Sequence, residues 1–211
     1  MTVFIFLLPI NFSSNFRKMG TLAHNIYANL FVMNKLITAL IVFISLSNGY
    51  SQSLNSLLNE LKKQPKQDSV KAYLCTEIAW EYLENNVDSA LIYANQALKY
   101  AKTTNNVIQL VDAYNVSGNI YRYQSKFELA IKSFNLSLDL LRKNNGNYKK
   151  FCSVYTNLGN VYNSKKDFPL AIHNYKKAIH LAEINNDDKY LIQVYNNLVG
   201  VYQLLGQLKR G

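Results

Sequence analysis

The last two thirds of the chain repeat with a period of about 40 residues. Four segments line up through an aromatic or small residue that is followed seven positions later by a tyrosine. The first of these positions are Cys75, Tyr114, Tyr155 and Tyr195, so the successive steps are 39, 41 and 40 residues. A fixed period of this length predicts stacked units, none of which can bury its apolar face alone.

The third unit shows most clearly how one repeat is built. Residues 153–162 are predicted to form a first helix, residues 165–168 a turn and residues 169–179 a second helix. Apolar residues recur every three or four positions in both helices, which indicates one buried stripe on each. Asp167 suits the N-cap of the second helix, and Pro169 suits its first turn.

Two small residues of this unit, Gly159 and Ala171, lie where the two helices of the hairpin must approach each other. A bulky side chain at either position would push the helices apart.

This pattern resembles the tetratricopeptide repeat, which has an aromatic residue, a Leu-Gly pair and a Tyr on its first helix. Its second helix carries Ala, an aromatic residue and Ala. The third unit supplies these positions with Tyr155, Leu158, Gly159, Tyr162, Ala171, Tyr175 and Ala178. The second unit supplies Tyr114, Gly118, Tyr121, Ala130, Phe134 and Ser137, with Ser117 where Leu is usual. The first unit departs further, with Cys75, Ile78, Ala79, Tyr82, Ala90, Ala94 and Ala97.

The resemblance implies an all-α fold, a right-handed α-solenoid of antiparallel helix pairs with about three and a half repeats. We expect the array to cover residues 67–205 and to be followed by a short tail at 206–211. The expected repeats are 68–106, 107–147, 148–187 and an incomplete one at 188–205. The family's repeat normally has 34 residues, and we place the extra residues at the end of the second helix, as at 181–188.

The fourth unit has a first helix without a partner helix after it. Its apolar residues do not form the polar outer face that the end of a solenoid needs: Val194, Tyr195, Leu198, Val201, Tyr202 and Leu205. Either the gene is truncated or a partner covers this end.

Residues 33–51 have the composition of a secretory signal peptide. Lys35 precedes an apolar run at 36–46, and the small residues Gly49 and Ser51 follow it. The run is too short to span a bilayer, which needs about 20 residues. We therefore expect an exported, periplasmic or extracytoplasmic protein that is cleaved near Ser51. The alternative is an uncleaved segment that lies on the membrane.

Residues 1–32 precede this signal and contain neither an acidic residue nor a repeat. We interpret them as an over-extended reading frame that makes Met33 the true start; the alternative is a long, two-part leader. Residues 52–66 are expected to form a short capping helix and a linker. The helix has one apolar stripe, formed by Leu54, Leu57, Leu58 and Leu61.

No pattern in the sequence indicates catalysis, a metal centre or a cofactor. We find no glycine-rich phosphate loop, nucleophile elbow or metal-ligand spacing, and His173 and His180 have no ligating residue at a suitable distance along the chain. Glu77, Glu81 and Glu84 share a helix face, which we interpret as solvated. We expect a protein that is not an enzyme.

The net charge of +10 is dispersed along the chain. Its basic pairs are interpreted as a solvated convex face; the alternative is a weak preference for acidic partners or an anionic membrane surface. Binding to nucleic-acid phosphates would require a basic stripe, so we expect no nucleic-acid partner. The basic pairs are Lys149-Lys150, Lys165-Lys166 and Lys176-Lys177.

The two cysteines, Cys75 and Cys152, lie two repeats apart. Helix axes pack about 8–10 Å apart, whereas a disulfide needs Cα atoms within about 7 Å. Both are therefore predicted to be buried thiols.

The resemblance places the functional surface on the concave side, which the first helix of each repeat lines. The side chains expected there are mostly carboxamides, which can bond an extended peptide backbone through donors and acceptors. They are Asn115, Asn119, Arg122, Thr156, Asn157, Asn160, Asn163, Gln193, Asn196, Asn197 and Gln203. We expect Asn119, Asn157 and Asn160 to contribute to binding and hardly to folding.

One subset of the family clamps a C-terminal carboxylate with two asparagines, lysines and an arginine. Asn119 and Asn157 match the asparagine positions. Asn115 and Gln193 occupy the lysine positions and Asn197 the arginine position. A carboxylate would lack its cationic partners here, so this clamp is not expected.

These features favour a non-catalytic module that binds a peptide or protein in its concave groove, with no stable membrane span in this chain. The alternative is a truncated extracytoplasmic sensor region of a bacterial two-component histidine kinase. The signal peptide, the 40-residue repeats and residues 87–98 resemble such regions. In those proteins a membrane helix and an output domain follow, and neither occurs within the 211 residues.

Overall fold

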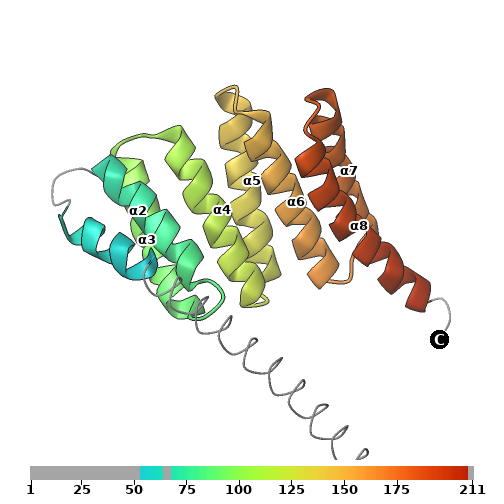
Figure 1. The fold of residues 1–211 in the computed structure, drawn as a ribbon, viewed down its shortest axis with the longest axis horizontal. Coiled ribbons are helices and arrows are strands. Elements are labelled where there is room, and N and C mark those ends of the chain that lie inside the picture. The colour runs from blue at the N-terminus through green and yellow to red at the C-terminus, as the bar shows by residue number, and fades with distance from the viewer. Residues whose placement is uncertain (1–52, 64–67, 209–211) are drawn as a thin grey trace, which may run out of the picture. The chain divides into compact units, whose positions relative to one another are not determined.

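The computed structural model describes residues 53–63 and 68–208 of the chain (Figure 1). The chain divides into two units between Gln52 and Ser53. The predicted signal peptide and the over-extended start lie outside the described residues. So does the part of the predicted linker at 64–67.

The described residues form helices and short turns, in the order of the sequence (Figure 1). After a short helix at 53–63 come α2 (Asp68–Tyr82), α3 (Val87–Thr103), α4 (Val107–Tyr123), α5 (Phe127–Lys143), α6 (Tyr148–Ser164), α7 (Phe168–Ile184) and α8 (Asp188–Leu208). Each helix packs against the next one along the chain. The short turns make neighbours antiparallel, so the predicted all-α solenoid of helix pairs is confirmed.

The short helix at 53–63 is amphipathic. Its four leucines, at positions 54, 57, 58 and 61, are half-buried, whereas every other residue of the helix is exposed. Leu61 packs against a cluster formed by Cys75, Ala97 and Ala113. The helix therefore lies against the first two repeats through its apolar stripe.

The helices are longer than the sequence predicts. In the third repeat, α6 begins at Tyr148 instead of residue 153, and α7 ends at Ile184 instead of residue 179. Each has 17 residues. The expectation that the extra length of the repeat lies at the end of the second helix is therefore wrong, because both helices share it.

The later turns use the same backbone geometry to end a helix. The residue after each C-cap is left-handed, with φ between 50° and 63°; these residues are Asn105, Ser125, Asn145, Lys166 and Asn186. The N–H of the next residue bonds back to the helix, as when Asp167 donates to the Tyr162 carbonyl at 2.8 Å. This is the Schellman arrangement. Asp167 then caps α7 by accepting from the Leu170 N–H at 3.2 Å, and the prediction for its N-cap is confirmed.

The turn between α5 and α6 has one residue more than the turns on either side. Gly146 follows the left-handed Asn145, and Asn147 caps α6. A Cβ on Gly146 would lie 2.4 Å from a methyl carbon of Leu141, so only glycine fits there without a shift. A cavity of about 450 Å³ lies beside this turn, with Val107 among the apolar residues of its lining.

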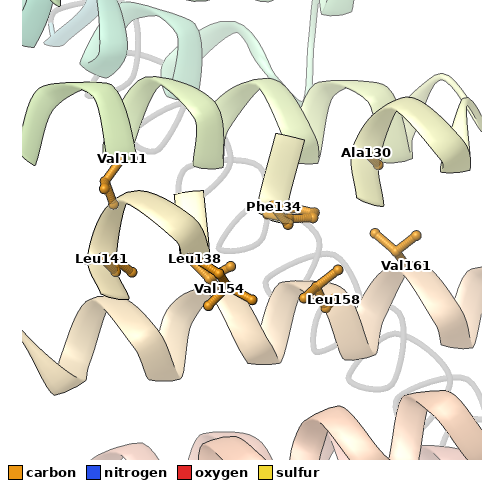
Figure 2. Packing of buried hydrophobic residues seen from close by; sticks show 8 residues of the cluster. All are labelled: Val111, Ala130, Phe134, Leu138, Leu141, Val154, Leu158 and Val161. Carbon is orange, nitrogen blue, oxygen red and sulfur yellow. The ribbon is translucent and has the colours of Figure 1, made fainter. Parts of the chain in front are cut away.

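The core of each repeat forms where three helices meet. Figure 2 shows one such cluster, in which side chains of α4 and α5 converge with side chains of α6. Its buried members are Val111, Ala130, Phe134, Leu138, Leu141, Val154, Leu158 and Val161. Because α6 belongs to the following repeat, no repeat completes its core alone.

A glycine on the first helix makes room for an aromatic ring of the second. A Cβ would lie 2.6 Å from the Phe134 ring at Gly118 and 2.5 Å from the Tyr175 ring at Gly159. Tyr175 is 1% exposed, and burial raises the pKa of its hydroxyl to about 12. The predicted close approach of the two helices at Gly159 is confirmed.

Both cysteines are buried free thiols, as predicted. The Cys75 thiol donates to Gln96 Oε1 at 3.7 Å, and the Cys152 thiol donates to the Ala178 carbonyl at 3.5 Å. Burial raises the pKa of each thiol to about 11. They therefore act as small apolar groups within the helix pairs.

We predict opposite effects of the same substitution at two helical glycines. Gly159→Ala should lower the free energy of unfolding by about 1–3 kcal/mol, because the new methyl group collides with the Tyr175 ring. Gly200→Ala should raise it by up to about 1 kcal/mol, because no atom lies within 4 Å of the added Cβ and alanine favours a helix. Urea denaturation measures both, and a loss at Gly200 equal to that at Gly159 would contradict the packing described here.

Candidate functional site

The first helices of successive repeats touch one another, whereas the second helices do not. Contacts join α2 to α4, α4 to α6 and α6 to α8; among the described helices none joins α3 to α5 or α5 to α7. Stacked pairs that lie closer on one side curve towards that side. The first helices therefore line the concave side of the array, which we call the inner face.

Carboxamides join α4 to α6 along the inner face. Asn157 Nδ2 donates to Asn115 Oδ1 at 2.9 Å, and Asn115 Nδ2 donates to Ser153 Oγ at 3.4 Å. Asn119 is only 4% exposed and donates to the Asn115 carbonyl at 3.1 Å. Asn115 and Asn157 therefore close the seam between two repeats, whereas Asn119 bonds within α4.

Asn160 also has a structural partner. Its Oδ1 accepts a hydrogen bond of 2.6 Å from the hydroxyl of Tyr175, the ring that packs on Gly159. The expectation that Asn119, Asn157 and Asn160 contribute hardly to folding is therefore wrong. The helical register does place them on the inner face, but Asn157 and Asn160 lie close enough to a neighbouring helix to bond across, and Asn119 bonds to the backbone of its own helix.

The other predicted groove residues divide into two groups. Arg122, Thr156 and Asn163 are partly or fully buried on α4 and α6, and Arg122 stacks on the Tyr123 ring with its guanidinium carbon 4.6 Å from the ring centroid. On α8, Gln193, Asn196 and Gln203 are exposed and Asn197 is half-buried. Only the α8 group presents its amides freely to solvent.

The first group retains unused hydrogen-bonding capacity. Arg122 Nε, Thr156 Oγ1 and Asn163 Oδ1 are buried polar atoms to which no described residue is hydrogen-bonded. Buried polar atoms are almost always paired with protein, water or ligand. Because the protein encloses these three atoms, a bound molecule would reach them only after the side chains that cover them move.

Exposed aromatic residues on the inner face were not predicted. Tyr73 and Trp80 on α2 and Tyr123 on α4 all present their rings to solvent. Trp80 occupies the position that Asn119 and Asn160 hold in the next two repeats. The repeat pattern singles out only the aromatic residues that recur at the same position in successive units, and these three lie outside those positions.

Acidic side chains lie beside these rings. Glu77 and Glu84 continue the helix line of Tyr73 and Trp80. Burial raises the pKa of Glu77, and the nearby carboxylate of Asp112 raises it further. The inner face of α2 is therefore aromatic and acidic.

A lysine of α6 balances part of this negative charge at the junction between α4 and α6. Asp112 forms an ion pair with Lys150 of α6, and Tyr148 donates to Asp187 at 3.1 Å at the next junction. Away from these pairs the inner face of α6 and α8 is mainly neutral and rich in amides. The face thus changes in chemistry along the array.

Two segments of the chain match family models for the tetratricopeptide repeat, at residues 111–150 and 153–185. Two successive repeats of the chain are therefore similar to tetratricopeptide repeats. No curated protein sequence matches it.

Solved structures of other proteins share the fold. One is a signal transduction ATPase with numerous domains (STAND) with a tetratricopeptide repeat sensor from Pyrococcus horikoshii, at 20% identity and a TM-score of 0.61. The match covers 70% of this chain and 23% of that protein. Another is BtubC (BKLC) from P. vanneervenii, at 21% identity and a TM-score of 0.63, covering 77% of this chain and 69% of that one. At these identities the likeness concerns the fold alone.

Among the helices that the structure describes, none is long and apolar enough to cross a membrane.

We predict that the seam amides stabilise the fold. Asn157→Ala should lower the free energy of unfolding by about 1 kcal/mol or more, because it removes a hydrogen bond and leaves Asn115 Oδ1 without its donor. Gln193→Ala, at an exposed position of α8, is the matched control and should change it by less than about 0.5 kcal/mol. Thermal denaturation of both variants is the measurement, and equal shifts would show that the seam bond contributes nothing.

Proposed function

We propose that the chain is a non-catalytic interaction module whose inner face binds an extended peptide or a segment of a protein partner. The observation that carries this proposal is the row of solvent-exposed rings of Tyr73, Trp80 and Tyr123 on the inner face. Aromatic residues supply much of the binding free energy at protein interfaces. Tetratricopeptide repeats, to which two repeats of the chain are similar, are typical of interaction modules and not of enzymes.

The unpaired polar atoms support the same proposal. Thr156 Oγ1 and Asn163 Oδ1 lie on α6, and Arg122 Nε lies on α4. Once the side chains that enclose these atoms move aside, a peptide backbone that crosses the helices would offer both N–H donors and carbonyl acceptors to them. The exposed amides of Gln193 and Asn196 would extend this contact to α8.

The charges on the inner face favour a partner that is basic at one end of the bound segment and neutral at the other. Glu77 and Glu84 flank Trp80 on α2, and Asp112 lies on the neighbouring helix. A basic side chain placed here would meet carboxylates and the face of an aromatic ring. We therefore propose that the segment bound at α2 is basic, and that the segment bound at α6 and α8 is neutral.

The test uses peptides selected from a random library for binding to the protein. Trp80→Ala should lower the affinity for the selected peptides by about tenfold or more, as expected for an aromatic residue at the centre of an interface. Ile92→Ala is the control, because Ile92 is also a large apolar residue exposed to solvent but lies on the second helix α3. Isothermal titration calorimetry gives the affinities and thermal denaturation checks the fold.

Two results would contradict this proposal. One is full affinity of the Trp80→Ala variant for every selected peptide. The other is a loss of affinity in the Ile92→Ala variant that matches the loss in Trp80→Ala, which would place the binding surface on the outer side.

A second proposal is an exported sensor region of a signalling protein, such as a histidine kinase. It is favoured by the predicted signal peptide at 33–51 and by the shared fold of the STAND protein, which is described as having a tetratricopeptide repeat sensor. The coding sequence beyond codon 211 tests it, because a membrane span and an output domain should follow in frame. A product that starts near Gln52, detected by mass spectrometry of the native protein, would support export, and a retained N-terminus would contradict it.

A further inference from the structure

The cavity beside Gly146 lies at one of three equivalent junctions of the array. At each junction the end of a second helix meets the start of its own first helix and the start of the next first helix. The three junctions join α2, α3 and α4, then α4, α5 and α6, and then α6, α7 and α8. The cavity lies at the middle junction, where Val107 at the start of α4 and Lys150 near the start of α6 line it.

Side-chain hydrogen bonds close the first junction. The hydroxyl of Thr103 on α3 donates to Asp68 of α2 at 3.1 Å. Gln109 Nε2 on α4 donates to the carbonyl oxygen of Ser69 at 2.7 Å and to its hydroxyl oxygen at 2.9 Å. The start of α2 is therefore tied to the end of α3 and to the start of α4.

Polar side chains also close the third junction. The hydroxyl of Tyr148 on α6 donates to Asp187 at 3.1 Å, and Lys149 Nζ lies 3.8 Å from the same carboxylate. Asp187 immediately precedes α8. The start of α6 is therefore tied to the start of α8.

The middle junction has apolar side chains at the positions that form these bonds in the preceding repeat. Val107 and Ile108 occupy the places of Asp68 and Ser69, and an aliphatic side chain neither donates nor accepts a hydrogen bond. Of the described helices that join successive repeats end to end, α5 and α6 also make the least contact. The cavity is therefore a feature of this junction and not of the repeat.

The walls of the cavity are mainly apolar. Two of the apolar residues, Val111 and Leu141, belong to the buried cluster of Figure 2, and the others are Val107 and Ile108. The volume of about 450 Å³ lies in the range of sites for small molecules, about 300–1,000 Å³. An apolar group that fills the cavity would remove its walls from water, which favours binding.

The charged side chains of the lining are both positive. Lys149 and Lys150 line the cavity together with asparagines of the turn, and no acidic residue in the described part of the chain does so. Lys150 forms its ion pair with Asp112, and Lys149 has Asp187 nearby. Each ammonium group has three N–H donors, so one carboxylate partner leaves donors for a second acceptor.

We propose that this cavity binds a small amphipathic anion. The apolar body of the ligand lies between Val107, Val111 and Leu141, and its carboxylate accepts hydrogen bonds from Lys149 and Lys150. This site is separate from the aromatic rings of the inner face and does not depend on the function proposed for them.

The test compares three compounds that share one apolar tail and differ in the charge of the head group. Decanoate, decanol and decylammonium are each titrated into the full chain below the concentration at which they form micelles, and isothermal titration calorimetry measures binding. Decanoate should bind about tenfold more tightly than decanol, because hydrogen bonds between charged groups are lost with the alcohol. Decylammonium should bind more weakly than decanol, because its charge repels the two lysines.

Substitutions establish where decanoate binds. Lys149→Ala should lower the affinity for decanoate several-fold and leave that for decanol unchanged, and Lys176→Ala, at an exposed lysine of α7, is the matched control. Ile108→Asp places a carboxylate in the lining and should abolish the binding of decanoate. Ile184→Asp is its matched control, because Ile108 and Ile184 are 66% and 61% exposed. Thermal denaturation checks the fold of each variant.

Three results would overturn the proposal. Equal affinity for decanoate and decanol would show that the lysines do not select an anion. Binding of decanoate that persists in the Ile108→Asp variant would place the ligand elsewhere on the protein. Failure of all three compounds to bind would show that the cavity does not accept an amphipathic molecule.

Discussion

The core of each helix pair in this protein is completed by the first helix of the next pair. Side chains of α4 and α5 meet Val154, Leu158 and Val161 of α6, and the same arrangement recurs between α7 and α8. Dispersion and burial in such a core require the distances between helices to be held within narrow limits. The glycine–ring contacts at Gly118 and Gly159 set the distance within a pair, and the short Schellman turns set the path between pairs.

Much of this arrangement is contained in the sequence. Positions that must be small or aromatic repeat with the period of the structure, so the fold and the contact at Gly159 could be predicted. The ends of the helices could not be predicted, because none of the left-handed turn residues in the described part of the chain is glycine. Ser125 and Lys166 adopt positive φ without any residue-type signal, and the tertiary packing of the pairs determines where they do so.

The candidate site was predicted only in outline. Helical register places Asn115, Asn119 and Asn157 on the inner face, but the spacing between α4 and α6 decides whether they face solvent or one another. Periodicity carries no information about that spacing. Trp80 was missed because the repeat pattern is built from residues that recur, and the next two repeats have asparagine at the position of Trp80.

The hydrogen bonds between Asn157, Asn115 and Ser153 link the energetics of two repeats. If the third repeat unfolds, the second loses both its core partner and its amide partners, so the repeats behave as a cooperative unit. A ligand that bridges α4 and α6 would bind only when both repeats are folded. The free energy of binding of such a ligand would then stabilise repeats that the ligand does not touch. A ligand on the inner face would therefore raise the free energy of unfolding of the whole array.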